Sequence, residues 1–143
     1  MDADHPFRQH QGGLTVGKRQ TLQVAGFSHA NPIPAAARVG PLLMSGLING
    51  TDPDTGKLAE TLDAQCSCMF RQVRNILAAG GGTIDQLVRM TVWLKDRSQR
   101  GPLNEQWLAM FPDANDRPAR LSLQASELTG GILVQCEITA YID

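Results

Sequence analysis

The most regular pattern in this chain is Ile132-Leu133-Val134-Gln135-Cys136-Glu137-Ile138-Thr139-Ala140-Tyr141-Ile142, in which apolar residues recur at every second position. Successive side chains of a β-strand point to opposite faces of a sheet, so this alternation predicts a strand that is buried on one face and open on the other. The residues expected on the buried face are Ile132, Val134, Cys136, Ile138, Ala140 and Ile142.

A long amphipathic helix is predicted over Leu62–Ala79. Its apolar residues recur at spacings of i, i+4, i+7 and i+8, which places them in one stripe along the helix. Thr61 precedes the first turn as an N-cap, and Gly80 follows the last turn, where glycine commonly ends a helix. Thr83 and Gln86 have the spacing of a capping box, which predicts one further short helical turn.

Two further strands and a second helix complete the pattern. A strand is predicted over Leu87–Leu94 and a helix over Leu103–Phe111, while Pro41 within Val39–Ser45 indicates an edge strand or a turn between two pieces. The residues expected on the more apolar face of the first strand are Val88, Met90, Val92 and Leu94. The order strands, helix, strand, helix, strands predicts an α+β domain with two helices packed on one face of a sheet.

Composition limits the class of protein. With 143 residues, 42% of them hydrophobic and 19% charged, the chain is expected to fold as one domain over residues 21–143, after a flexible N-terminal extension at 1–20. A formal net charge of −1 gives no electrostatic argument for a nucleic-acid partner. No apolar run approaches the ~18 residues that a membrane span needs, and no signal peptide is visible. Three cysteines without a framework favour reduced thiols and a cytoplasmic location.

A candidate binding residue lies in Arg117-Pro118-Ala119-Arg120, which leads into the alternating run 121–125. The guanidinium of Arg120 offers a planar fork that fits a carboxylate, although a surface or interface ion pair is the alternative role. The open face of the sheet is expected to carry Arg120, Ser122, Gln124, Gln135 and Glu137, with Leu133, Tyr141 and Trp93. If the last two strands pair antiparallel, the polar residues form a site for a small anion and a water, on a half-apolar face that favours an oligomer.

Other constellations carry no predicted chemistry. Cys66 and Cys68 diverge by ~200° on a helix and cannot ligate one metal ion. Cys66 falls on the apolar stripe of its helix and Cys136 on the apolar face of the last strand, so a structural role is expected for the cysteines. The segment 52–56 is expected to be a turn, and no zinc site or nucleophilic triad is predicted around the histidines.

Several motifs together resemble one family. They are Arg117-Pro118-Ala119-Arg120, Val134-Gln135-Cys136-Glu137-Ile138-Thr139-Ala140-Tyr141-Ile142, Thr91-Val92-Trp93-Leu94-Lys95-Asp96, Asn104 with Trp107 and Phe111, and Ser45-Gly46 with Asp52-Pro53-Asp54-Thr55-Gly56. In order and spacing over about residues 21–142, they resemble the Rid family (RidA, YjgF, formerly L-PSP).

The resemblance implies a chorismate-mutase-like α+β fold, a homotrimer with three clefts between subunits, and hydrolysis of reactive enamines or imines to 2-keto acids and ammonia. It implies no metal and no organic cofactor. Arg120 falls where the family arginine holds the substrate carboxylate, and Ser45 and Gly46 match the segment whose backbone contacts the ligand. Ser122 takes a position that is often cysteine, and Asn104 matches a recurrent asparagine near the cleft.

Two departures from the family pattern leave the function open. Gln135 stands where RidA proteins have a glutamate, and the cleft tyrosine has no counterpart in the segment 29–34. A glutamine accepts a hydrogen bond from water but cannot take its proton near neutral pH. One hypothesis is therefore an imine or enamine hydrolase that uses Arg120 and Gln135, and the alternative is a non-catalytic module that binds small carboxylates in the same cleft. An RNA-cleaving or chaperone-like role is disfavoured by the near-zero net charge.

Overall fold

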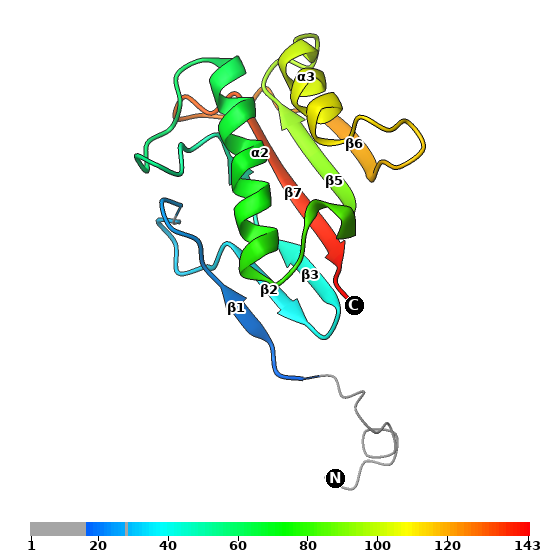
Figure 1. Cartoon of the computed structure of the whole chain (residues 1–143). Coiled ribbons are helices and arrows are strands. Elements are labelled where there is room, and N and C mark those ends of the chain that lie inside the picture. Colours follow the sequence, from blue (N-terminus) through cyan, green and yellow to red (C-terminus); the bar gives the residue numbers. More distant parts are fainter. Residues whose placement is uncertain (1–16, 28) are drawn as a thin grey trace, which may run out of the picture.

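The computed structural model describes residues 17–27 and 29–143, which form one mixed β-sheet with two α-helices on one of its faces (Figure 1). The strands are β1 (Gln20–Leu22), β2 (Ala36–Val39), β3 (Leu42–Ser45), β4 (Ile48–Asn49), β5 (Leu87–Leu94), β6 (Ala119–Gln124) and β7 (Val134–Tyr141). The helices are α2 (Leu62–Ala79), α3 (Gly101–Met110) and the short 3-10 turn η1 (Ile84–Gln86). The predicted α+β class, with both helices on one face, is confirmed.

The strand order is β1-β2-β3-β7-β5-β6, and β4 continues beside β7 after β3 ends. All neighbours are antiparallel except β5 and β6, which are parallel and are joined through α3. The strand with the most regular alternation, β7, lies between β3 and β5, while β6 forms one edge of the sheet. This order separates the last two strands of the chain by a third strand.

Local signals set the helix ends where the sequence predicts them. The predicted bounds of α2 are confirmed, and the Thr61 hydroxyl accepts a hydrogen bond from the backbone N–H of Ala64 at 3.1 Å. Gly80 is the C-cap of the same helix. The predicted capping box of Thr83 and Gln86 is also present and begins η1. The second helix, α3, begins at Gly101 and ends at Met110, close to the predicted range.

The covered face of the sheet holds the core. The inward residues of β7, from Val134 to Ala140 at every second position, are at most 1% exposed, as predicted. Cys66 of α2 packs in the same core, and burial, with a smaller contribution from Asp63, raises the pKa of its thiol to about 12. Cys66, Cys68 and Cys136 are all buried free thiols, which agrees with their predicted structural role.

One predicted face assignment is wrong in β5. Val88 is 51% exposed, whereas Met90, Val92 and Leu94 are fully buried as predicted. The pairing of β5 with β7 shifts register between Leu87 and Arg89, so the alternation restarts there. Leu87 takes the buried position instead, because an irregularity of this kind turns the following side chains to the other face.

A buried amide fixes the start of β7 against α2. Gln65 has no exposed surface, and its Nε2 atom donates to the carbonyls of Ala59 and Gly131 at 2.9 Å each. Its Oε1 atom accepts from the N–H of Leu133 at 2.9 Å. A Cβ atom at Gly50 would overlap the Cα atom of Gln65, so the close approach of this helix to the chain after β4 requires glycine.

The remaining sequence-based expectations concern the chain end and the turn before β3. Most of the predicted flexible extension, residues 1–16, lies outside the described residues. The chain turns at Gly40, which has a positive φ of 56°, and Pro41, so the segment is two short strands, the second of the two alternatives. No described helix is both long and apolar enough to cross a membrane.

Candidate functional site

The Arg120 side chain lies between β6 and α3, on the helix-covered side of the sheet. Its Nη2 atom donates to the Oδ1 atom of Asn104 at 2.8 Å, and its Cζ atom is 5.0 Å from the ring centroid of Trp107. Its Nη1 atom is buried and has no hydrogen-bond partner among the described residues. A buried cationic donor without a partner is costly, so this geometry suits an anionic ligand.

The helix α3 positions both groups that hold this guanidinium. Asn104 and Trp107 are three residues apart and therefore share one face of the helix. Phe111 contacts the indole edge to face, with ring centroids 4.9 Å apart at an angle of 61°, and so fixes the ring under the guanidinium. Desolvation, with a smaller contribution from the positive charge of Arg100, lowers the pKa of Arg120, yet an arginine stays protonated at neutral pH.

Ser122 extends the site along β6. It is two residues from Arg120 on the same strand face, about 7 Å further along the strand. Its hydroxyl oxygen is buried and, like the Nη1 atom of Arg120, has no partner among the described residues. The structure therefore brings together Arg120, Asn104 and Ser122, and it adds Trp107, to which the sequence assigned no role in binding. We call this set the arginine site.

Ser45 and Gly46 lie elsewhere, at the end of β3. The Ser45 hydroxyl accepts from the N–H of Ile138 at 2.9 Å and donates to the carbonyl of Gly46 at 2.7 Å. These bonds join the end of β3 to β7. The path from Ser45 to Arg120 crosses three inter-strand spacings, or about 14 Å. The folded chain by itself thus does not bring the two segments together.

The predicted face for the polar residues is wrong for β6. Arg120 pairs with Met90 of β5 and Met90 pairs with Ile138 of β7, so Arg120 points to the helix-covered side. The same pairing places Ser122 and Gln124 on that side, while Leu121 and Leu123 face the open side.

Gln135 and Glu137 face the open side, as predicted, because they alternate with buried residues of β7. The last two strands do not pair with each other, so the condition for a shared face is not met. Register is set by β5, a partner distant in sequence, and the alternation of β6 alone could not reveal it.

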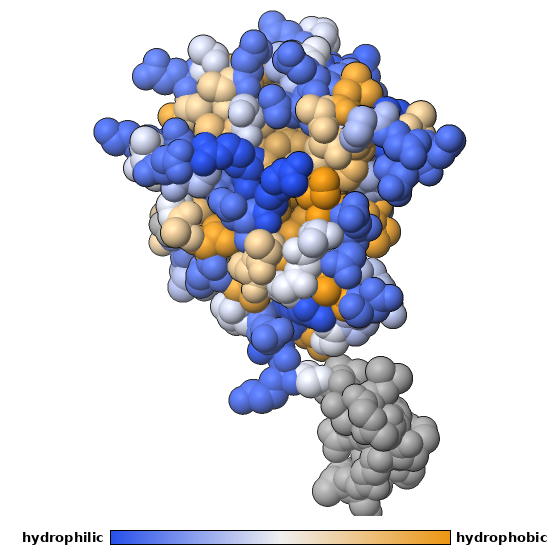
Figure 2. Space-filling view, in the orientation of Figure 1, coloured by the Kyte–Doolittle hydropathy of each residue, from blue (hydrophilic) through white to orange (hydrophobic). Residues whose placement is uncertain are grey.

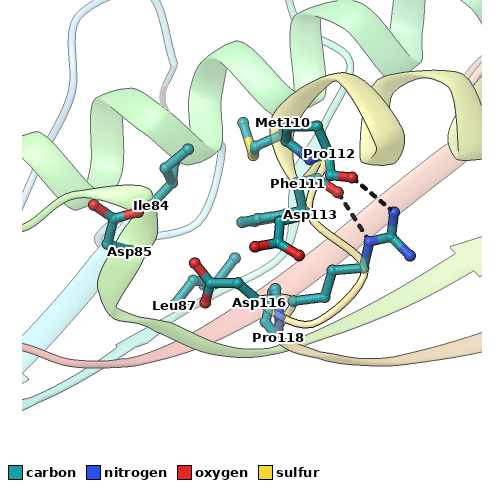
Figure 3. Close-up of a pocket in the computed structure, with 10 residues that line it drawn as sticks. Ile84, Asp85, Leu87, Met110, Phe111, Pro112, Asp113, Asp116 and Pro118 are labelled. Atoms are coloured by element: carbon teal, nitrogen blue, oxygen red, sulfur yellow. Dashed lines mark hydrogen bonds between the residues drawn. The ribbon is translucent and has the colours of Figure 1, made fainter.

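A cavity of about 240 Å³ lies near the start of β6 (Figure 3). Its lining contains no residue of the arginine site, so the two are distinct. Its lining residues are Ile84, Asp85, Leu87, Met110, Phe111, Pro112, Asp113, Asp116, Arg117 and Pro118. The Arg117 guanidinium donates to the carbonyls of Phe111 at 2.9 Å and Pro112 at 3.4 Å, which gives it a structural role. Three carboxyl groups line this cavity, so it would disfavour an anionic ligand.

Comparison with known proteins gives consistent matches. A model of the family described as Endoribonuclease L-PSP matches residues 20–142. The chain is 35% identical over 101 residues to a RutC family protein of Aquifex aeolicus, which covers 71% of this chain and 80% of that protein. It is 29% identical over 117 residues to the 2-iminobutanoate/2-iminopropanoate deaminase of Salmonella typhimurium, covering 74% and 91%. The solved structure of RidA from an Antarctic Psychrobacter superposes with a TM-score of 0.77 at 30% identity, covering 86% and 99%.

Proposed function

Because the chain belongs to the Endoribonuclease L-PSP family, also called the Rid family, we propose that it hydrolyses small enamines or imines that carry a carboxylate. The products are a 2-keto acid and ammonia. The observation that carries the proposal is the buried Nη1 atom of Arg120, which has no partner among the described residues. The name of the Salmonella relative, an imine deaminase, supports the same reaction class.

Arg120 binds the substrate carboxylate in this proposal. The Nη2 atom is held by Asn104 and the ring of Trp107 supports the guanidinium plane, so Nη1 is presented in a fixed direction. The Ser122 hydroxyl supplies a second donor on the same side of the strand. A clamped carboxylate orients the neighbouring C=N carbon toward water, and such positioning contributes to the rate.

Once the carboxylate is bound, the hydrolysis needs few further groups from the protein. An enamine first tautomerises to the imine. Water then adds to the C=N carbon, and the π electrons move to nitrogen, which takes one proton of the water, so that a carbinolamine forms. The C–N bond then breaks, its electron pair leaves with ammonia, and the hydroxyl oxygen becomes the keto oxygen after it loses its proton to the leaving nitrogen. Gln135 holds the water by a hydrogen bond in this scheme, and the substrate nitrogen carries the proton.

We further propose that the complete site forms between subunits of a homotrimer. Gln135 and the Ser45–Gly46 segment are remote from Arg120 within one protomer, so a neighbouring protomer would have to supply them. The open face offers an apolar surface for such assembly. Its exposed large apolar residues on β3, β6 and β7 are Leu42, Met44, Leu121, Leu123 and Tyr141, each 38–53% exposed.

Substitution of Arg120 tests the proposal. We expect Arg120→Ala to reduce turnover of 2-iminobutanoate by about 100-fold, because it removes charge-assisted hydrogen bonds of about 1.5–3 kcal/mol. Arg120→Lys keeps the charge but loses the planar fork, so it should recover only part of the activity. Arg74→Ala, at an exposed arginine on α2, is the matched control. Unchanged turnover in Arg120→Ala would contradict the proposal.

Gln135 favours a second candidate, a module that binds small carboxylates without chemistry. The residue at this position cannot act as a base, so binding and catalysis are separable here. Gln135→Glu distinguishes the two candidates in an imine-hydrolysis assay beside the wild type. A gain in rate supports the hydrolase, whereas no activity in either protein, together with binding of 2-oxobutanoate, supports the binding module.

A further inference from the structure

Arg100 lies at the start of α3, the helix whose Asn104 contacts Arg120. It is the N-cap residue of α3, and its carbonyl accepts a hydrogen bond from the N–H of Asn104 at 2.9 Å. Arg100 and Asn104 are therefore one helical turn apart, about 6 Å along the axis. Asn104 in turn contacts the guanidinium of Arg120. Two arginines thus flank one asparagine.

Arginine is an unfavourable choice at this position of a helix. N-caps favour Ser, Thr, Asp or Asn, whose side chains accept from the free N–H groups, and Arg100 makes no such side-chain bond. A positive charge is also unfavourable at the N-terminal end of the helix dipole. The charge of Arg100 further acts on Arg120, because it is the second cause, after desolvation, of the lowered pKa of that guanidinium. The positive charge of Arg100 is therefore unfavourable both for the helix and for the charged form of Arg120.

No interaction within the described residues offsets these costs. The ion pairs there join Arg71 to Asp52 and Asp54, and none involves Arg100 or Arg120. Glu105, the nearest acidic residue along α3, is exposed and makes no ion pair with Arg100. Residues that are unfavourable for the local structure and have no compensating contact are found mainly at functional sites. An anionic group bound beside Arg120 would remove the repulsion between the two arginines.

We propose that Arg100 binds a second acidic group of the substrate, so that the preferred substrates are imines of dicarboxylic 2-keto acids. The inference rests on the proposed function, because it assigns the first carboxylate to Arg120. The second carboxylate, two or three carbons away, lies toward the first turn of α3. Arg100 is a specificity-determining residue in this scheme and takes no part in the addition of water.

The stable keto-acid products serve as probes. Isothermal titration compares 2-oxoglutarate, a diacid, with 2-oxobutanoate, a monoacid, on the wild type and on Arg100→Gln. We expect the wild type to bind the diacid about fivefold more tightly, which corresponds to the upper range for an exposed ion pair. The ratio should fall toward one in Arg100→Gln, stay high in Arg100→Lys, and decrease with added salt. Arg74→Gln removes the same charge from α2 and should keep the wild-type ratio.

The outcomes separate this inference from the proposed function. Equal affinities in the wild type, no binding of 2-oxoglutarate, or a diacid preference that survives in Arg100→Gln would each overturn the role of Arg100. Binding of 2-oxobutanoate that is lost in Arg120→Ala would still support the carboxylate site in those cases. Binding of both acids that is unaffected by Arg120→Ala would overturn the carboxylate site itself, and the inference with it.

Discussion

Both faces of the sheet carry apolar residues, but only the covered face buries them. On the covered face, Ile138 and Leu43 are at most 1% exposed beneath the helices. On the open face, Met44 and Tyr141 from the same two strands are 52% and 53% exposed. The outer surface of the helix-bearing side is mostly hydrophilic, with apolar patches between the hydrophilic side chains (Figure 2). The apolar area of the open face has no partner within the described part of the chain.

The two faces of the sheet carry different residues of the candidate site. The arginine site lies at the margin of the covered face, where α3 holds Arg120, whereas Gln135 faces the open side. A single chain therefore separates the residue proposed to bind the carboxylate from the residue proposed to hold the water. If both act on one substrate, assembly through the open face is a condition of catalysis.

Outside the arginine site, the largest effect is expected from a charge on the open face. Leu121→Asp would place a carboxylate in the proposed interface, where burying an unpaired charge is strongly unfavourable. We expect dissociation to monomers in sedimentation velocity and a loss of turnover of at least tenfold. Leu108→Asp is the matched control, because Leu108 is 53% exposed but belongs to α3 on the other side of the sheet. A wild-type protein that is monomeric and active would contradict the proposed role of the open face in assembly and catalysis.

A smaller effect is expected at a polar group within the core. Gln65→Ala leaves the N–H of Leu133 and two carbonyls without their partner and opens a cavity. We expect the free energy of unfolding to fall by about 3 kcal/mol in urea denaturation. Gln99→Ala, at an exposed loop position, should change it by less than about 0.5 kcal/mol. Equal losses in both variants would contradict the role of Gln65.

Ser45 connects the ends of two strands, and its loss should be milder. Ser45→Ala removes the acceptor of the Ile138 N–H, which should lower the free energy of unfolding by about 1–2 kcal/mol. Faster amide exchange at Ile138 is the specific measurement, since a general loss of packing would accelerate other amides equally. Unchanged exchange at Ile138 would show that the hydroxyl is not a required acceptor.

The smallest expected effect is a pH dependence of stability, which depends on how completely the covered face excludes water. The pKa of Cys66 is raised from 9.0 to about 12 by burial, so the folded thiol stays protonated while the unfolded thiol ionises. The unfolded state then binds fewer protons, so the contribution of this thiol to stability begins to fall as the pH approaches 9.0 and continues to fall until about pH 12. From pH 8 to 9 the loss for one thiol is about 0.4 kcal/mol. Cys66→Val should reduce this pH dependence in urea denaturation, and an unchanged slope would contradict a dry core.

Helix ends were predictable because their signals act over three or four residues. Thr61, Gly80 and the pair Thr83 and Gln86 define caps through neighbours in the chain, and all take the predicted roles. The buried face of β7 was equally predictable, since alternation along one strand is a local property.

Register and strand neighbours were not predictable in the same way. The face of Arg120 depends on its pairing with Met90, thirty residues away in the chain, and the face of Val88 depends on an irregularity in pairing with β7. The family motifs named Asn104, but its bond to Arg120 needs the placement of α3 over β6. Arg100 belongs to no motif, and only its position in α3, one turn before Asn104, indicates a role for it.

The place of β7 in the sheet also has a consequence for biosynthesis. β7 follows every other strand in the chain, yet it lies between β3 and β5. On the ribosome, β1–β3 and β5–β6 emerge before the strand that joins them, and each group has an unpaired edge until then. The nascent chain therefore cannot close its sheet before β7 is made. In that interval the open edges of neighbouring nascent chains are the sites where they would pair wrongly.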